Sequence, residues 1–303
     1  MNDRRTLLTL GVSACVAAGM SGEALAQRRL IDPETLIPKS PEEGLNQFIR
    51  MFAGYHQSSV FTNEGIIYGK VPGSLPKPLF GFLAVLDIRA REVSPGLFRS
   101  EQKEAMTYLD LATRQPIQRW RNVYNQEDQA VIGYVSLTNV YFFDKTGSAI
   151  REPPKAASTA RDWRTSSTDI WVTESRFNSF PASISEAEFP RAYAGLERLS
   201  VDILTYRARA TDFANPRLTS VPVQLTMLSD TPWPLWMMMS KAEGGVFWHG
   251  FGQKYRRMAD IPAANSKAIN AAYPGFLDSP WGFPSELWGT VAQLRRLRSE
   301  GKL

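Results

Sequence analysis

His249 is the side chain of this sequence best suited to acid–base chemistry, because it is one of only two histidines and lies among aromatic residues. In a strand, His249 would share a face with Phe247 and Phe251 and point away from Trp248. An imidazole among aromatic walls has its charged form disfavoured and could act as a base near neutral pH. The alternative is a histidine that only makes hydrogen bonds within the fold, because no serine or cysteine nucleophile motif accompanies it.

Charged residues flank His249 in the stretch from Leu228 to Ile261. Asp230 and Glu243 precede the histidine, and Lys254 follows it. A carboxylate with a basic partner at the open end of a barrel could orient a polar substrate group, or work as a general acid and base. Charged residues at strand ends are also commonly solvated and only weakly paired, so a purely surface role is the alternative.

The same stretch, which reads as two apolar strands about a Gly-Gly turn, is rich in tryptophan and methionine. Trp236, Met238 and Trp248 could form an adaptable apolar wall for a hydrophobic or planar ligand, because consecutive methionines on a strand present thioethers to both faces. Trp120 could stack on a ligand in a similar way. Packing in the core is the alternative for all four side chains.

The usual ligands for metals and cofactors are scarce. Cys15 is the only cysteine and lies in an N-terminal export signal, so the mature chain would have no thiol for disulfides, thiolate metal sites or iron–sulfur clusters. His56 and His249, without a spaced carboxylate motif, are a weak metal signal. The sequence has no Walker loop, no GxGxxG before a helix, no HExxH and no GxSxG. We therefore expect neither a cofactor nor a metal.

The charge distribution does not favour nucleic-acid binding. Lys and Arg number 35 against 30 Asp and Glu, and the basic residues are spread along the chain. A nucleic-acid binder usually concentrates them on one face or tail.

Residues 1–26 have the pattern of a secretory signal peptide. Arg4 and Arg5 lead into an apolar run, and Ala24-Leu25-Ala26 forms a cleavage site of small residues before Gln27. The arginine pair resembles the twin-arginine class, which implies the twin-arginine export machinery as a partner. The apolar run is interrupted and shorter than the roughly 20 residues of a spanning helix, so no stable membrane anchor is expected. We expect a periplasmic or secreted protein.

The remainder predicts an extended lead-in at residues 27–39 and a single β-rich domain at 40–303. An N-cap serine and a proline at the first helical position predict a helix over 40–54. Apolar and β-branched runs predict strands over 65–69, 79–91, 97–110, 130–143, 169–180, 199–210 and 221–228. Helical pieces are expected over 183–195, 266–272 and 285–298, and a long surface loop over 148–167.

These strands follow one another at short intervals, without long helices between them. This order favours a mainly β fold of the α+β kind, with a large antiparallel, strongly curved or barrel-like sheet and a few peripheral helices.

Several short motifs resemble one known family. They are Pro78-Leu79-Phe80-Gly81-Phe82, Trp120-Arg121-Asn122, Trp233-Pro234-Leu235-Trp236 followed by Gly244-Gly245, and Gly252-Gln253-Lys254. They are similar to a bacterial and fungal family catalogued as domain of unknown function 1838, a resemblance that covers most of the mature chain. It implies a single β-rich domain and no activity or catalytic residues. Where the family tends to have a proline and a Thr-Gly turn after the asparagine, this chain has Val123 to Glu127.

The sequence thus predicts an exported protein that binds a small hydrophobic or aromatic molecule inside a barrel-like cavity. One alternative is a cofactor-independent hydrolase, isomerase or cyclase that uses His249 with a nearby carboxylate in the same cavity. Another is an interaction protein of the cell envelope, which a broad exposed apolar patch would favour.

Overall fold

A computed structural model describes residues 31–303, apart from 56, 147–148, 152–154, 280 and 282–288. The fold described below is that of the unit Asp32–Leu303. The predicted signal peptide and His56 lie outside the described residues. Within the described part, no helix combines the length and apolar character needed to cross a membrane.

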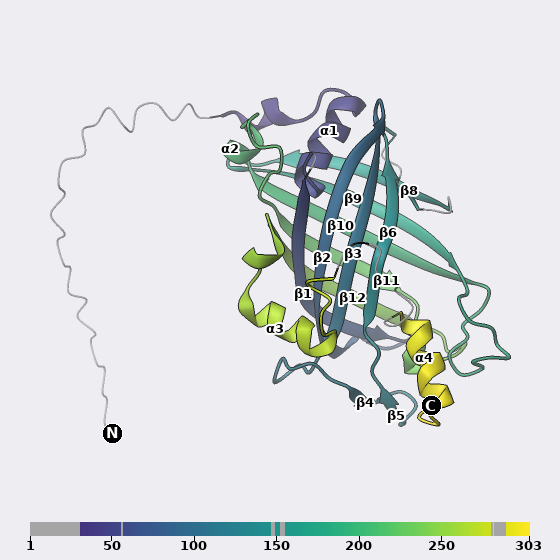
Figure 1. Ribbon diagram of the computed structural model, residues 1–303. Helices are drawn as coiled ribbons and strands as arrows, with labels where there is room; N and C mark the ends of the chain where they lie inside the picture. Colours follow the sequence, from purple (N-terminus) through teal and green to yellow (C-terminus); the bar gives the residue numbers. More distant parts are fainter. Residues whose placement is uncertain (1–30, 56, 147–148, 152–154, 280, 282–288) are drawn as a thin grey trace, which may run out of the picture. The chain divides into compact units, whose positions relative to one another are not determined.

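Ten antiparallel strands form the main sheet of the described residues (Figure 1). β1 pairs with both β2 and β12, so the sheet closes on itself in the order β1-β12-β11-β10-β9-β8-β7-β6-β3-β2. The strands are β1 (Ser58–Lys70), β2 (Lys77–Ser94), β3 (Leu97–Leu109), β6 (Tyr134–Phe143), β7 (Ala149–Arg151), β8 (Lys155–Thr165), β9 (Asp169–Pro181), β10 (Glu197–Arg209), β11 (Gln224–Thr231) and β12 (Gly245–Tyr255). The predicted mainly β fold with a large, strongly curved antiparallel sheet is confirmed.

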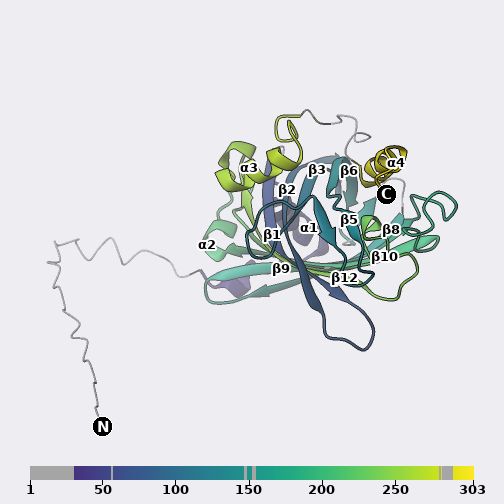
Figure 2. The ribbon, with the colours of Figure 1, turned by 90° about the horizontal axis from the view of Figure 1, so that it is seen from below.

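Helix α1 (Pro41–Phe52) fills one end of the barrel, and Figure 2 shows it within the ring of strands. Its N-terminus forms as predicted, because the Ser40 side chain accepts a hydrogen bond from the Glu43 amide at 3.1 Å. Phe48 and Phe52 pack on Phe143 of β6, with ring centroids 5.5 and 5.2 Å away. The helix is therefore an apolar plug for this end of the barrel.

A second plug fills the other end. It combines a small hairpin, β4 (Arg119–Arg121) and β5 (Asp128–Ala130), with the 3-10 helix η2 (Leu235–Met237) in the connection from β11 to β12. The side chains of Trp120 and Trp236 join inward residues of β2 and β3 in a second apolar cluster.

The other helices lie on the outside. α3 (Ala263–Ala272) contacts β2 and β3, and its Ile269 is completely buried among outward residues such as Val85 and Ala105. α4 (Thr290–Ser299) contacts η2. The remaining short elements are η1 (Pro33–Leu36), α2 (Ala210–Phe213) and η3 (Met258–Asp260).

Several predicted elements were wrong. The predicted loop over 148–167 contains β7 and β8, because this stretch of small and polar residues is completed as sheet by its pairing with β6 and β9. Residues 183–195 form turns instead of the predicted helix. For the helix predicted over 285–298, the structure describes helix α4, which begins at Thr290. The described part of the lead-in contains the helical turn η1.

Candidate functional site

Strand β12 places His249 on the outer wall of the barrel. The histidine shares its face with Phe247 and Phe251, as expected from the period of a strand, and its ring lies 4.8 Å from that of Phe251. Phe251 is 57% exposed. The inward face of β12 instead carries Val246, which is fully buried, and Trp248. The face that carries Phe247, His249 and Phe251 is therefore not the one that lines the barrel, so the expected place of His249 in an interior cavity was wrong.

The two carboxylates proposed as partners do not complete a catalytic group with His249. Asp230 lies across from Phe247 on the outer wall and pairs with Lys70. Glu243 is exposed in the connection that precedes β12. Among the described residues, no carboxylate is within hydrogen-bonding distance of His249, so the structure does not bring Asp230 or Glu243 to the histidine as its partner.

Trp236 is a core residue of the second plug. It is 1% exposed, and its ring lies 5.6 Å from Phe80, 5.2 Å from Tyr108 and 6.0 Å from Trp120. Burial raises the pKa of Tyr108 to about 12, as expected for a phenol in a packed apolar cluster. Trp120 and Trp236 thus pack against each other in the core, which corresponds to the alternative of core packing.

The methionine run does not form a strand. Met237 ends the 3-10 helix, and Met238 has a left-handed backbone with φ of 53°. The side-chain amides of Asn122 and Gln129 both donate to the Met237 carbonyl, at 3.0 and 2.8 Å. These bonds fix the connection onto the β4–β5 hairpin and replace the strand pairing that the sequence predicted.

Met238 and Trp236 also line a pocket of about 440 Å³ on the outer side of this plug. Its rim is charged and includes Asp128, Arg191 and Arg298. The other lining residues are Glu127, Gln129, Ala130, Glu188, Phe189, Pro190, Ala192, Lys302 and Leu303.

Lys254 is a structural residue that joins the barrel to α1. Its ammonium donates to the carbonyls of Arg50 and Met51, both at 2.9 Å, at the C-terminal end of the helix. A cation there satisfies carbonyls that lack helical partners. Burial of the side chain lowers the pKa of Lys254 well below its ordinary value. The predicted ligand-binding role of Lys254 is therefore not supported.

The middle of the barrel, between the two plugs, is lined by mixed side chains. Leu86 and Met227 contact both inner apolar clusters, yet each is only partly buried. Trp248 also points inward and is partly buried. Its ring lies 5.3 Å from Phe82, and its Nε1 donates to the Thr231 hydroxyl at 3.0 Å. Side chains in a packed interior usually lose nearly all exposure, so this layer is less tightly filled than the plugs.

Two amide side chains in this interior keep buried atoms without a hydrogen bond. Asn63 donates to the Met227 sulfur at 3.2 Å, and its Oδ1 has no partner among the residues that the structure describes. The Nε2 of Gln102 also has none. Buried polar atoms are nearly always hydrogen-bonded, so each of these atoms is a position at which a further molecule could bond.

A charged layer lies next to the α1 plug. Glu174 is completely buried and accepts bonds from Nε and Nη2 of Arg176, at 2.9 and 2.5 Å. The Arg161 guanidinium lies 4.1 Å from the centre of the Phe48 ring. Nearby on β10, burial raises the pKa of Asp202, although hydrogen bonds from Ser229 and Asn178 oppose this effect.

Sequence reasoning missed this polar interior, although a signal was present. In β9, Glu174, Arg176 and Asn178 continue the alternating positions of Ile170 and Val172, which are buried. Polar residues in register with buried ones indicate a polar patch inside the barrel.

Comparison with known proteins identifies the family. No curated protein and no solved structure matches this chain. A family model described as "Protein of unknown function (DUF1838)" matches residues 56–286, which is more than half of the chain and includes every motif that suggested the resemblance. The chain belongs to this family of β-rich proteins.

Proposed function

We propose that this protein binds a small hydrophobic or aromatic molecule inside the barrel, between the two plugs. The observation that carries the proposal is the partial exposure of Leu86 and Met227, which face inward and contact both apolar clusters. Solvent-accessible surface on inward side chains of a closed sheet requires space beside them. Apolar interiors with a few polar groups are the usual form of a small-molecule site.

The surrounding side chains define the chemistry of the ligand. Leu86, Met227 and Trp248 offer an aliphatic, a thioether and an indole surface, which suit a flat apolar body. Asn63 Oδ1 and Gln102 Nε2 supply an acceptor and a donor that have no partner in the described part of the chain. Asn63 and Gln102 lie on β1 and β3 with β2 between them, so a ligand with two separate polar groups, a donor for Asn63 and an acceptor for Gln102, would satisfy both atoms. This gains free energy because such atoms are costly to bury unpaired.

Fluorescence titration with N-phenyl-1-naphthylamine, a flat apolar probe, tests this proposal. Met227→Trp would fill the interior, and Leu228→Trp is a matched control because the neighbouring residue points outward. We expect the probe to bind the unmodified protein and to bind Met227→Trp at least about tenfold more weakly, with Leu228→Trp unchanged. Circular dichroism would establish that both variants fold. Absence of probe binding, or equal loss in both variants, would contradict an interior site.

We also propose that the chain is exported by the twin-arginine route and acts in the periplasm or outside the cell. The support is the Arg4-Arg5 pair and the cleavage pattern before Gln27. Expression of the full chain in a bacterium, followed by fractionation and N-terminal sequencing, would give a mature protein that starts at Gln27. Replacement of both arginines by lysine should retain the protein in the cytoplasm. Export that continues unchanged would contradict the twin-arginine route.

The outer wall supports a second candidate function, association of two copies of this chain. Four outward side chains on β9, β10 and β12 are strongly exposed: Phe177 (53%), Leu199 (66%), Ile203 (38%) and Phe251 (57%). At about 200 Å² for a fully exposed large apolar side chain, they present roughly 400 Å², about half of what each partner contributes to a standard interface. Large apolar side chains exposed together on one face of a protein are often functional.

The edge of this face suits a second copy, because both signs of charge occur there as pairs. Lys70 pairs with Asp230, and Arg114 pairs with Glu64. The positive and negative charges of these pairs cancel, so two copies would not repel each other at this edge. Sedimentation equilibrium should show a dimer that Phe251→Ser and Leu199→Ser weaken by at least about tenfold. A monomer at all concentrations would exclude this association.

A further inference from the structure

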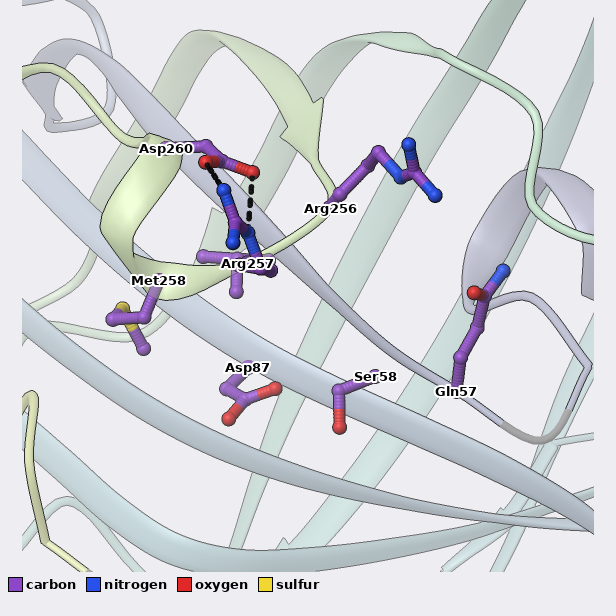
Figure 3. Close-up of a pocket in the computed structure, with 8 residues that line it drawn as sticks. Gln57, Ser58, Asp87, Arg256, Arg257, Met258 and Asp260 are labelled. Carbon is purple, nitrogen blue, oxygen red and sulfur yellow. Dashed lines mark hydrogen bonds and ion pairs between the residues drawn. The ribbon is translucent and has the colours of Figure 1, made fainter.

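A groove of about 840 Å³ lies on the outer wall, where β1 and β2 meet the segment that follows β12 (Figure 3). It is separate from the barrel interior, because its β1 and β2 residues are on the outward face. The groove is lined by Gln57, Ser58, Val60, Asp87, Arg256, Arg257, Met258 and Asp260.

Asp87 forms the acidic floor of the groove. Its cross-strand neighbour is Lys103, but the Lys103 ammonium donates to the carbonyls of Ser279, at 2.7 Å, and Leu277, at 3.4 Å. The Oδ1 atom of Asp87 is buried and has no hydrogen-bond donor among the described residues. Burial raises the pKa of Asp87, and the charges of Lys103 and Arg89 only partly oppose this effect.

The rim of the groove is basic. Arg257 forms an ion pair with Asp260, at 2.8 Å, so this guanidinium is already occupied. Arg256 projects separately from that pair in Figure 3, and it has no hydrogen bond or ion pair within the described part of the chain. The groove therefore has one unpaired carboxylate oxygen on its floor and one available guanidinium on its rim.

We propose that this groove binds a small dipolar molecule with an ammonium and a carboxylate group, of the amino acid type. The ammonium would donate to Asp87 and the carboxylate would accept from Arg256, which can bind it with two parallel hydrogen bonds. The two carboxylates and two guanidiniums of the groove balance, so a ligand without net charge is electrostatically matched. Met258, which is partly buried, offers apolar surface to the ligand's side chain.

Other ligand classes fit less well. A phosphate or a simple carboxylic acid would place negative charge against Asp87, and a simple amine would leave Arg256 without an anion. Each alternative therefore uses one half of the groove only.

Isothermal titration with L-leucine, L-methionine and glycine tests the proposal, with propylamine and propionate as single-charge probes. We expect the amino acids to bind, and both Asp87→Asn and Arg256→Gln to weaken them by at least about tenfold. Asp128→Asn and Arg91→Gln, which remove exposed charges away from the groove, should leave binding unchanged. Binding at acidic pH should release protons, measured in buffers of different ionisation enthalpy, because an ammonium beside Asp87 favours its charged form.

Three results would overturn the proposal: no heat with any of the amino acids, equal binding by Asp87→Asn and its control, or equal binding of propylamine. Melting temperatures would show that each variant folds. The naphthylamine probe should bind Asp87→Asn normally, so failure of this site is distinguishable from failure of the interior site.

Discussion

Trp248 and His249 are consecutive in β12 but should contribute very differently to stability. Replacement of Trp248 by alanine removes its contacts with Phe82 and Tyr108 and its hydrogen bond to Thr231. Loss of a large core aromatic costs about 3–5 kcal/mol, and we expect about 3 kcal/mol because Trp248 is only partly buried. His249→Ala removes one edge-to-face contact on the outer wall, worth about 0.5–1 kcal/mol.

The two variants are matched, because they change neighbouring positions of one strand. Urea denaturation should show a difference of at least about 2 kcal/mol in the free energy of unfolding, close to thirtyfold in the equilibrium constant, with similar m-values. A second pair, Val246→Ala and Phe247→Ala, samples the same two faces. If His249→Ala destabilises the protein as much as Trp248→Ala, the assignment of inner and outer faces of β12 is wrong.

Four further predictions concern the plugs and the turn near β5. Phe48→Ala should lower the free energy of unfolding by about 3–5 kcal/mol in urea denaturation, because it empties the centre of the α1 plug. Ser40→Ala should cost about 1 kcal/mol, measured in the same way, through loss of the helix cap. Unfolded Lys254 holds its proton to higher pH than the folded residue. The free energy of unfolding should therefore rise with pH from the lowered folded pKa up to the ordinary value of 10.5, and Lys254→Met should flatten this rise in a pH series of denaturation curves. Gln126→Gly should raise the melting temperature slightly, because Gln126 has a φ of 62°, which is strained by about 1 kcal/mol for a residue with a Cβ.

The elements that local chemistry dictates were predictable from the sequence. The cap at Ser40 and the apolar face of the first helix predict α1 over nearly its whole length. In β2, Phe80, Phe82 and Ala84 alternate with other residues and lie inside, as the period of a strand requires. These signals succeed because the determining contacts lie within a few residues of one another.

The elements that depend on distant partners were not predictable. β8 consists largely of small and polar residues whose strand conformation is completed by pairing with β9. The methionine run leaves the strand pattern because Asn122 and Gln129, more than a hundred residues away, bond the Met237 carbonyl. Neither partner is visible in the local sequence.

The two faces of β12 show why the sequence did not reveal that His249 and Phe251 lie on the outside of the barrel. Both faces are aromatic, so the period alone does not tell inside from outside. Glycine offers the missing signal: a Cβ on Gly250 would lie 2.6 Å from the Phe82 ring and 2.7 Å from Asn63 Oδ1. Gly250 has the same parity as Trp248, and the concave inner face of a barrel is where such crowding arises. In the middle of β12, the crowding at Gly250 therefore marks the parity that faces inward.

The motifs shared with the family now have a structural explanation. Trp120 and Trp236 pack together, and Asn122 is completely buried and bonded to the connection that contains Trp236. The segment that follows this anchor forms the tip of the β4–β5 hairpin, where Val123 is 50% exposed. Gln126 takes the left-handed conformation that glycine favours, so the turn persists with a less suited residue. These motifs therefore build the plug that closes this end of the barrel, because their tryptophans and Asn122 hold the β4–β5 hairpin and the connection from β11 to β12 together.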